Sequence, residues 1–143
     1  MKSIAFYNNK GGVGKTTSAI NVSYELAKNS KVLIIDVDGQ ANCSRFFTEE
    51  LKSGLEHALV SSEVSPETAL CHTRYDNIDI ITATPKLNGI TSEFDSFSDE
   101  EQAAIARKIL SALHTIMFSL TCPLRSPKSP NGLSERVMWY LYR

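Results

Sequence analysis

A glycine-rich loop near the N-terminus constrains the fold of this chain more than any other feature. The loop, N-N-K-G-G-V-G-K-T-T at residues 8–17, follows a short apolar run, residues 3–8. It precedes a segment without glycine or proline that extends from Thr16 to about Asn29. A buried strand, a glycine-rich loop and a helix in this order are typical of phosphate-binding α/β proteins. The sequence therefore predicts a strand and a helix joined by such a loop.

A second apolar run follows the predicted helix. This run, K-V-L-I-I-D at residues 31–36, is nearly continuous in branched side chains and ends in an acid. Continuous apolar strands are typical of parallel sheets covered on both faces. Residues 3–36 therefore predict a right-handed βαβ unit. The helix would pack through a face of helical spacing, formed by Ala19, Ile20, Ser23, Leu26 and Ala27.

The middle of the chain predicts further, shorter elements. We expect short helices within residues 53–62 and 65–70, and a third strand over Ile78–Ala83. A longer helix is expected to begin near Ser98, because Ser98 and Glu101 have the spacing of a capping box. Its apolar face would comprise Ile105, Ile109, Ala112 and Leu113.

Composition excludes several classes of protein. The 143 residues are 42% hydrophobic and 22% charged, which is typical of a globular domain, and the net charge of -1 gives no overall reason to expect nucleic-acid binding. The three cysteines have no C-x-x-C spacing, which indicates neither a zinc site nor a disulfide framework. No segment has the length of a membrane span or a signal peptide. We expect a cytoplasmic protein with no membrane partner.

The loop residues have the chemistry of a nucleotide site. Glycines 11, 12 and 14 let successive N–H groups point inward at phosphate oxygens, and the following helix directs its positive end there. Lys15 would reach the β- and γ-phosphates, and the Thr16 hydroxyl would bind Mg²⁺. The usual pattern, G-x-x-x-x-G-K-[ST], has glycine at the position of Asn9. This chain instead has a second lysine inside the loop, Lys10.

The octapeptide K-G-G-V-G-K-T-T resembles the deviant Walker A loop of the ParA/MinD family of ATPases. The resemblance implies that Lys10 is catalytic and reaches the phosphates of a partner subunit in a nucleotide-sandwich homodimer, much as an arginine finger does. It implies a nucleotide-binding set of Lys10, Gly11, Gly12, Val13, Gly14, Lys15, Thr16 and Thr17.

A second segment, D-V-D-G-Q-A-N-C-S at residues 36–44, resembles the D-x-D-P-Q-x-N segment of the same family. Gly39 stands where proline is usual. The resemblance implies that Asp36 binds the magnesium shell through water and that Asp38 orients the attacking water. Gln40 and Asn42 favour the partition (ParA/Soj) branch over the cell-division (MinD) branch.

The resemblance implies an α/β, P-loop NTPase three-layer fold with a mostly parallel sheet, incomplete at its C-terminal end. The expected cofactors are ATP and Mg²⁺. The parent family adds an ATP-dependent homodimer, non-specific DNA, a ParB-like partner protein and association with the nucleoid. The expected function is that of an ATPase in plasmid or chromosome partitioning, in a truncated form.

The resemblance stops near residue 114, where the family continues with the Walker B strand. Residues 1–114 are expected to form the N-terminal part of the ATPase domain, and residues 115–143 an aberrant tail that is out of frame or disordered. In the shifted frame, the codons of residues 116–123 permit Y-V-L-I-D-L-P, which would be that strand. Three valines are forced in the shifted frame, from the residue pairs 117–118, 138–139 and 139–140. We therefore expect a frameshifted gene or a sequencing error.

Two alternatives to a partition ATPase stay open. The chain could be a non-catalytic nucleotide-binding fragment or regulatory module, because it lacks the Walker B aspartate. It could instead be a MinD-like positioning ATPase, although the tail has no amphipathic stripe for a membrane anchor. An assay of ATP hydrolysis with and without DNA would separate the first alternative from an active enzyme.

Overall fold

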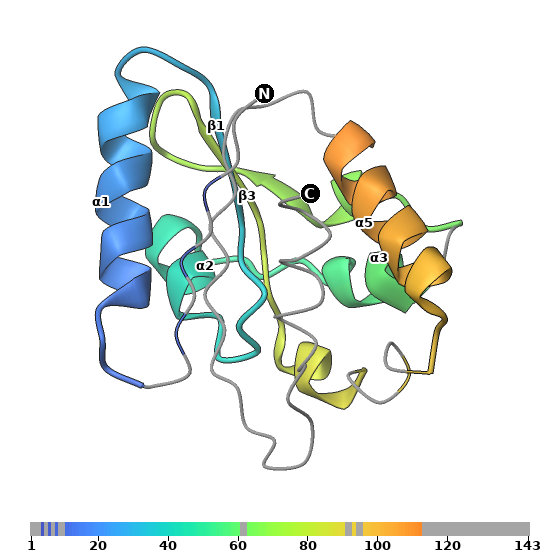
Figure 1. Ribbon diagram of the computed structural model, residues 1–143. Coiled ribbons are helices and arrows are strands. Elements are labelled where there is room, and N and C mark those ends of the chain that lie inside the picture. Colours follow the sequence, from blue (N-terminus) through green and yellow to red (C-terminus); the bar gives the residue numbers. More distant parts are fainter. Residues whose placement is uncertain are drawn as a thin grey trace.

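The computed structural model describes residues 4, 6, 8, 11–60, 63–90, 93 and 96–112. Short strands are interspersed among helices along this part of the chain (Figure 1). The elements, in chain order, are α1 (Lys15–Ala27), β1 (Val32–Ile35), α2 (Asn42–Phe47), α3 (Leu55–Val60), the 3₁₀ helix η1 (Pro66–Ala69), β2 (Leu70–His72), β3 (Ile78–Ile81), the 3₁₀ helix η2 (Pro85–Gly89) and α5 (Asp99–Ala112).

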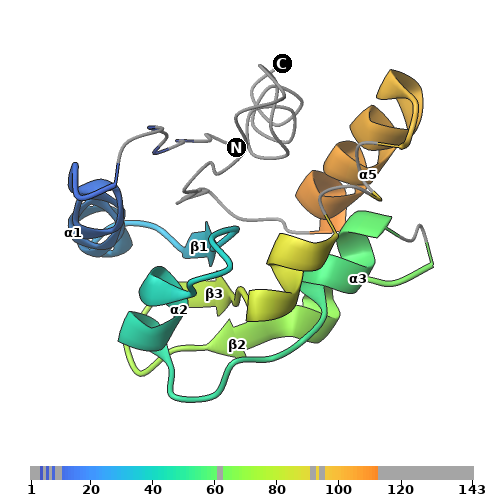
Figure 2. The same cartoon turned by 90° about the horizontal axis from the view of Figure 1, so that it is seen from below.

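The described strands form one mixed sheet in the order β1-β3-β2. β1 and β3 are parallel, with Val32 opposite Ile78 and Ile35 opposite Ile81. β2 pairs with the other edge of β3 in the antiparallel direction, with Leu70 opposite Ile81. Figure 2 shows the strands side by side, with α1 and α2 beyond one side and α3 and α5 beyond the other. The predicted α/β class is confirmed.

Each face of the sheet packs against its own hydrophobic core. Side chains of β1 alternate between the two faces, so that Leu33 and Ile35 join one cluster while Val32 and Ile34 join the other. The first cluster includes Leu55 and Leu59 of α3, Leu87 of η2 and Ile105 of α5, and the second includes Ala27, Cys43 and Phe47 from α1 and α2. All four β1 residues are buried. This burial explains the continuous apolar run in the sequence.

The first helix agrees closely with its prediction. α1 begins at Lys15 and ends at Ala27, and it buries Ala19, Ser23 and Ala27. Ile20 and Leu26, also predicted for the packed face, are partly buried against the core. Ser23 is tolerated in the core because its hydroxyl donates to the Ala19 carbonyl at 2.7 Å.

The capping box at the start of α5 is confirmed. The Ser98 N–H donates to Glu101 Oε2 at 2.8 Å, and the Glu101 N–H donates to Ser98 Oγ at 3.3 Å. Two orphan amides of the first turn are thereby satisfied. Ile105 is buried as predicted. The side chains of Ile109, Ala112 and Leu113 lie outside the described part.

The short predicted elements are confirmed with small changes. The helix expected within residues 53–62 is α3, the one within 65–70 is the 3₁₀ helix η1, and the third strand is β3. β2 and α2 were not predicted.

Of the strand expected over residues 3–8 only residues 4, 6 and 8 are described, and the tail at residues 115–143 lies outside the described residues, so both predictions stand untested. Nowhere in the described ranges is there a helix with the length and apolar character needed to cross a bilayer.

Candidate functional site

The glycine-rich loop ends in left-handed backbone immediately before α1. Gly12 has φ 71° and Gly14 has φ 87°, a region that side chains with a Cβ adopt only at a cost. Gly14 is the residue that precedes the helix, and its carbonyl accepts the Ser18 N–H at 2.8 Å. The chain therefore turns sharply into the helix, and the first-turn amides of α1 face the loop side.

Asp36 occupies the carboxyl end of β1 and is fully buried. Its Oδ1 accepts the Asp38 N–H at 3.1 Å, and its Oδ2 accepts both the N–H and the hydroxyl of Ser44, at 2.8 and 2.7 Å. Ser44 lies in the first turn of α2. The carboxylate thus satisfies an amide that the α2 helix leaves without an intrahelical partner, and this fixes the loop between β1 and α2.

Ser44 connects this carboxylate to the neighbouring strand. Its hydroxyl oxygen accepts the Ala83 N–H at 2.9 Å while its proton is donated to Asp36. Ala83 lies just beyond the end of β3, and both Ser44 and Ala83 are fully buried. One side chain therefore ties together the ends of the two parallel strands and the start of α2.

Asp38 lies in the turn that follows Asp36. Its Oδ1 accepts the Gln40 N–H at 2.9 Å, and its carbonyl accepts the Ala41 N–H at 2.7 Å. The residue is only 6% exposed. Burial raises the pKa of the Asp38 carboxyl above its usual range, and the Asp36 charge raises it further. The Gln40 N–H bond and the Lys15 ammonium act against this rise.

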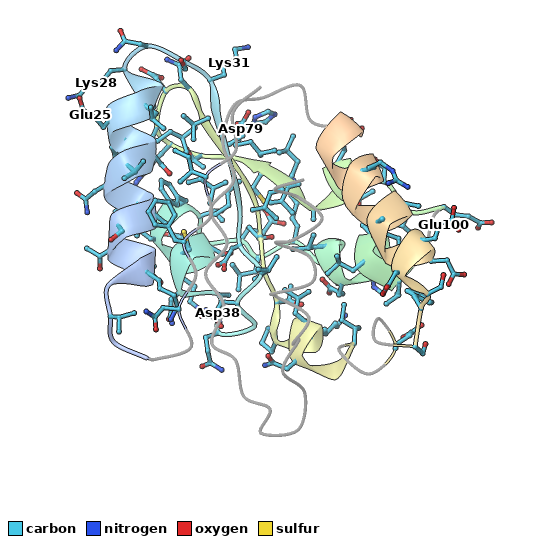
Figure 3. All side chains as sticks on the ribbon, in the orientation of Figure 1. Glu25, Lys28, Lys31, Asp38, Asp79 and Glu100 are labelled. Atoms are coloured by element: carbon cyan, nitrogen blue, oxygen red, sulfur yellow. The ribbon has the colours of Figure 1, made fainter. Side chains whose placement is uncertain are left out.

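The predicted site residues fall into two described groups. Gly11, Gly12, Val13 and Gly14 form the exposed loop, and Lys15, Thr16 and Thr17 form the first turn of α1. Asp36 and Asp38 form the second group, and the Lys15 ammonium acts to lower the pKa of Asp38. Figure 3 shows Asp38 near the end of the sheet where α1 begins, far from Lys31 and Asp79. Lys10 lies outside the described residues.

The residues expected to bind Mg²⁺ and its water shell are Thr16 and Asp36. In the described ranges, no three or more His, Cys, Asp or Glu side chains are grouped so that they could hold a metal ion. Mg²⁺ in nucleotide sites is typically bound through one or two carboxylates together with substrate phosphates.

A buried carboxylate on the opposite face of the sheet was missed by the sequence analysis. Glu56 of α3 is 1% exposed and accepts three hydrogen bonds. The donors are Ser53 Oγ at 2.5 Å, Thr84 Oγ1 at 3.0 Å and the Gly54 N–H at 3.3 Å. The hydrogen bonds outweigh burial and hold the pKa of Glu56 below its usual range. This cluster fixes α3 to the start of η2.

Ser44 was also missed, although it lies within the segment that carried the resemblance. Its role depends on a contact with Ala83, which is 39 residues away in the chain. Neither a periodic pattern nor a short motif in the sequence can indicate a contact between residues so far apart.

Comparisons with known proteins agree with this architecture. The chromosome-partitioning ATPase Soj of Thermus thermophilus is 39% identical over 94 residues, which are 65% of this chain and 36% of that protein. A plasmid partition protein of Borrelia burgdorferi B31, solved with bound AMPPNP, superposes with a TM-score of 0.76 at 23% identity. That match covers 98% of this chain and 59% of the other.

A third similar protein is the cobyrinic acid a,c-diamide synthase of Mycobacterium smegmatis, solved with bound ADP and magnesium. Its TM-score is 0.76 at 23% identity, covering 86% of this chain and 51% of that one. At 23% identity, these two structures show the shared fold alone. This chain spans between 36% and 59% of the length of the three proteins.

The family match is broader than the match to Soj. Residues 1–123 match the AAA_31 family, which is described as an AAA domain. The match includes the glycine-rich loop, Asp36 and Asp38, and every element from α1 to α5. The chain therefore belongs to the AAA_31 family of AAA domains, among the relatives of ParA/Soj-type partition proteins.

Proposed function

We propose that the glycine-rich loop and the Asp36–Asp38 segment form a binding site for ATP and Mg²⁺. One observation carries the proposal: Lys15 opens α1 directly after left-handed Gly14, at the end of the sheet where Asp38 lies (Figure 3). A cation, a helix start and a pair of carboxylates at one end of the sheet provide the charges that a magnesium-bound triphosphate requires. The AMPPNP and ADP of the two similar structures support this choice of ligand.

The phosphates would be bound by one lysine and by backbone amides. Lys15 binds the β- and γ-phosphates, and the backbone amides of the loop and the first helical turn bind phosphate oxygens. The nucleotide-binding set is Lys10, Gly11, Gly12, Val13, Gly14, Lys15, Thr16 and Thr17.

Thr16 and Asp36 are the proposed magnesium residues. Thr16 lies on the first turn of α1, directly after Lys15. Asp36 is suited to an outer-sphere role, because donors from Asp38 and Ser44 already fix both of its oxygens. A carboxylate held in this way accepts a bond from metal-bound water without changing its rotamer.

Lys10 and Asp38 are the proposed catalytic residues. Asp38 would orient the attacking water, since phosphoryl transfer depends mainly on positioning and charge neutralisation. Lys10 would act on the nucleotide of a partner subunit in an ATP-dependent homodimer. The support for both roles is the match of residues 8–17 and 36–44 to the segments of the partition family.

For the whole protein we propose a role in plasmid or chromosome partitioning. The names of the similar proteins, Soj and a plasmid partition protein, support this role. A ParB-like partner, non-specific DNA and a cytoplasmic, nucleoid-associated location belong to the same proposal.

The test is phosphate release from Mg²⁺-ATP, with and without non-specific DNA, by a version of the protein whose reading frame is restored after residue 114. Lys10→Ala is the variant and Lys31→Ala its control. Lys31 is an exposed lysine just before β1, away from Asp38. The proposal expects turnover that DNA increases, that Lys10→Ala abolishes and that Lys31→Ala leaves unchanged. ATP binding without turnover would support a nucleotide-binding module instead. Absence of both binding and turnover would refute the proposed function.

A further inference from the structure

The side chain of Asn88 packs directly over Gly39. A Cβ atom built on Gly39 would lie 2.6 Å from Cγ and 2.7 Å from Nδ2 of Asn88, closer than real Cβ contacts allow. A Cβ at Gly39 would therefore displace the Asn88 amide, which is the end of an exposed side chain. The two residues belong to different elements, because Gly39 follows β1 and Asn88 lies in η2.

Gly39 is the second residue of the turn that carries Asp38. The turn is closed by the Ala41 N–H, which donates to the Asp38 carbonyl at 2.7 Å, and by the Gln40 N–H, which donates to Asp38 Oδ1. The second position of such a turn favours proline, which fixes φ in advance. Glycine at this position leaves the turn with more conformational freedom to lose on folding. The turn therefore depends on contacts from outside itself.

Asn88 is presented to the turn by a well-anchored element. The neighbouring Leu87 is buried in the hydrophobic core, and its N–H donates to the Thr84 carbonyl at 3.1 Å. Thr84, just before η2, donates its hydroxyl to the buried Glu56 at 3.0 Å. The backbone of Asn88 is fixed by these contacts, although its own side chain is exposed. Figure 1 shows η2, in yellow, close to the loop that follows β1.

We propose that Asn88 is a positioning residue that holds the turn at Gly39 and, through it, the Asp38 carboxylate. In a turn with proline, the fixed φ restricts the backbone of the turn. In this chain, the contact between Asn88 and Gly39 would restrict it instead. The effect of this contact on ATP hydrolysis rests on the proposed function, in which Asp38 orients the attacking water. The structural consequence, a turn closed by Asn88, does not depend on any ligand.

The ligand-free test is hydrogen exchange at the Gln40 and Ala41 amides, measured by NMR on the full 143-residue chain. Asn88→Ala should speed exchange at both amides by about threefold to tenfold, which lies within the range of coupling for residues in contact. Gly39→Ala, which displaces the Asn88 amide, should have a similar effect. Adding Asn88→Ala to Gly39→Ala should change exchange by less than about twofold, because both variants remove the same contact. Gly89→Ala is the matched control, because its Cβ would meet no atom within 4 Å.

The second readout compares phosphate release with the affinity for Mg²⁺-ATP, both measured in the frame-restored protein. Because Asp38 is assigned to the attacking water, a positioning role predicts that Asn88→Ala lowers turnover severalfold and leaves the affinity nearly unchanged, whereas a general loss of stability would lower both alike.

Unchanged Gln40 and Ala41 exchange in Asn88→Ala, or additive effects in the double variant, would overturn the inference whether or not the chain binds ATP. Altered exchange in a chain that binds no ATP would support the turn contact and refute the proposed function alone.

Discussion

Replacing Ser44 with alanine should destabilise the fold far more than removing an exposed hydroxyl does. The Ser44 hydroxyl is fully buried, donates to the Asp36 carboxylate at 2.7 Å and accepts the Ala83 N–H at 2.9 Å. A hydrogen bond to a charged group contributes about 1.5–3 kcal/mol, and a buried amide left without an acceptor costs about 1–3 kcal/mol. Because water entry and relaxation offset part of this sum, Ser44→Ala should lower the free energy of unfolding by about 2–4 kcal/mol.

Urea denaturation followed by circular dichroism measures this loss. With a slope of about 2 kcal/mol per molar urea, the midpoint should fall by about 1–2 M while the slope itself stays the same. The matched control is Ser18→Ala on the exposed side of α1, which should stay within about 0.5 kcal/mol of the wild type. In an Asp36→Asn background, Ser44→Ala should cost less, because the charged acceptor is already gone. A Ser44→Ala variant as stable as Ser18→Ala would refute the bridging role of Ser44.

Two buried carboxylates and one loop glycine yield the remaining predictions. Asp38→Asn should raise the thermal midpoint at pH 7, because burial and the Asp36 charge raise the pKa of Asp38 and so disfavour its ionised form in the folded state. This gain should vanish as the pH falls below about 3.9, where folded and unfolded wild type are both protonated. Glu56→Gln should lower stability at pH 7. The pKa of Glu56 is held low in the folded state, so the difference should narrow below about pH 4.3 as the wild type loses this contribution. Thermal scans from pH 7 to pH 3 test both, and pH-independent differences would contradict them. Gly14→Ala should cost about 1–2 kcal/mol in urea denaturation, because its φ is 87°, whereas Gly11→Ala, with open space for a Cβ and no positive φ, should cost less. Equal costs would contradict that reasoning.

Elements with a strong local pattern could be predicted from the sequence. α1 and α5 each present a helical repeat of apolar residues, and α5 also has a capping box at Ser98. β1 and β3 are mostly apolar runs, because parallel strands covered on both faces have no polar side. In each of these elements, the local preference of the chain agrees with its place in the fold.

Elements and contacts that depend on distant residues could not be predicted. β2 has three residues, too few for its period to be visible, and the buried face of α2 includes the polar Ser44, which weakens its apolar period. The bridge formed by Ser44 and the packing of Asn88 on Gly39 each join segments that only the folded sheet brings together. Glu56 is different, because Ser53 precedes it with the same spacing as Ser98 and Glu101. That spacing was visible in the sequence and could have indicated the bond between Ser53 and Glu56.

In the proposed site, the loop before α1 binds the phosphates of Mg²⁺-ATP through Lys15. Titration calorimetry of Mg²⁺-ATP into the 143-residue chain tests it most directly, with Lys15→Ala as the variant and Lys31→Ala as the control. We expect saturable binding at one site, weakened by at least about tenfold in Lys15→Ala and retained in Lys31→Ala. Equal binding by the wild type and Lys15→Ala, or no binding by the wild type, would contradict it.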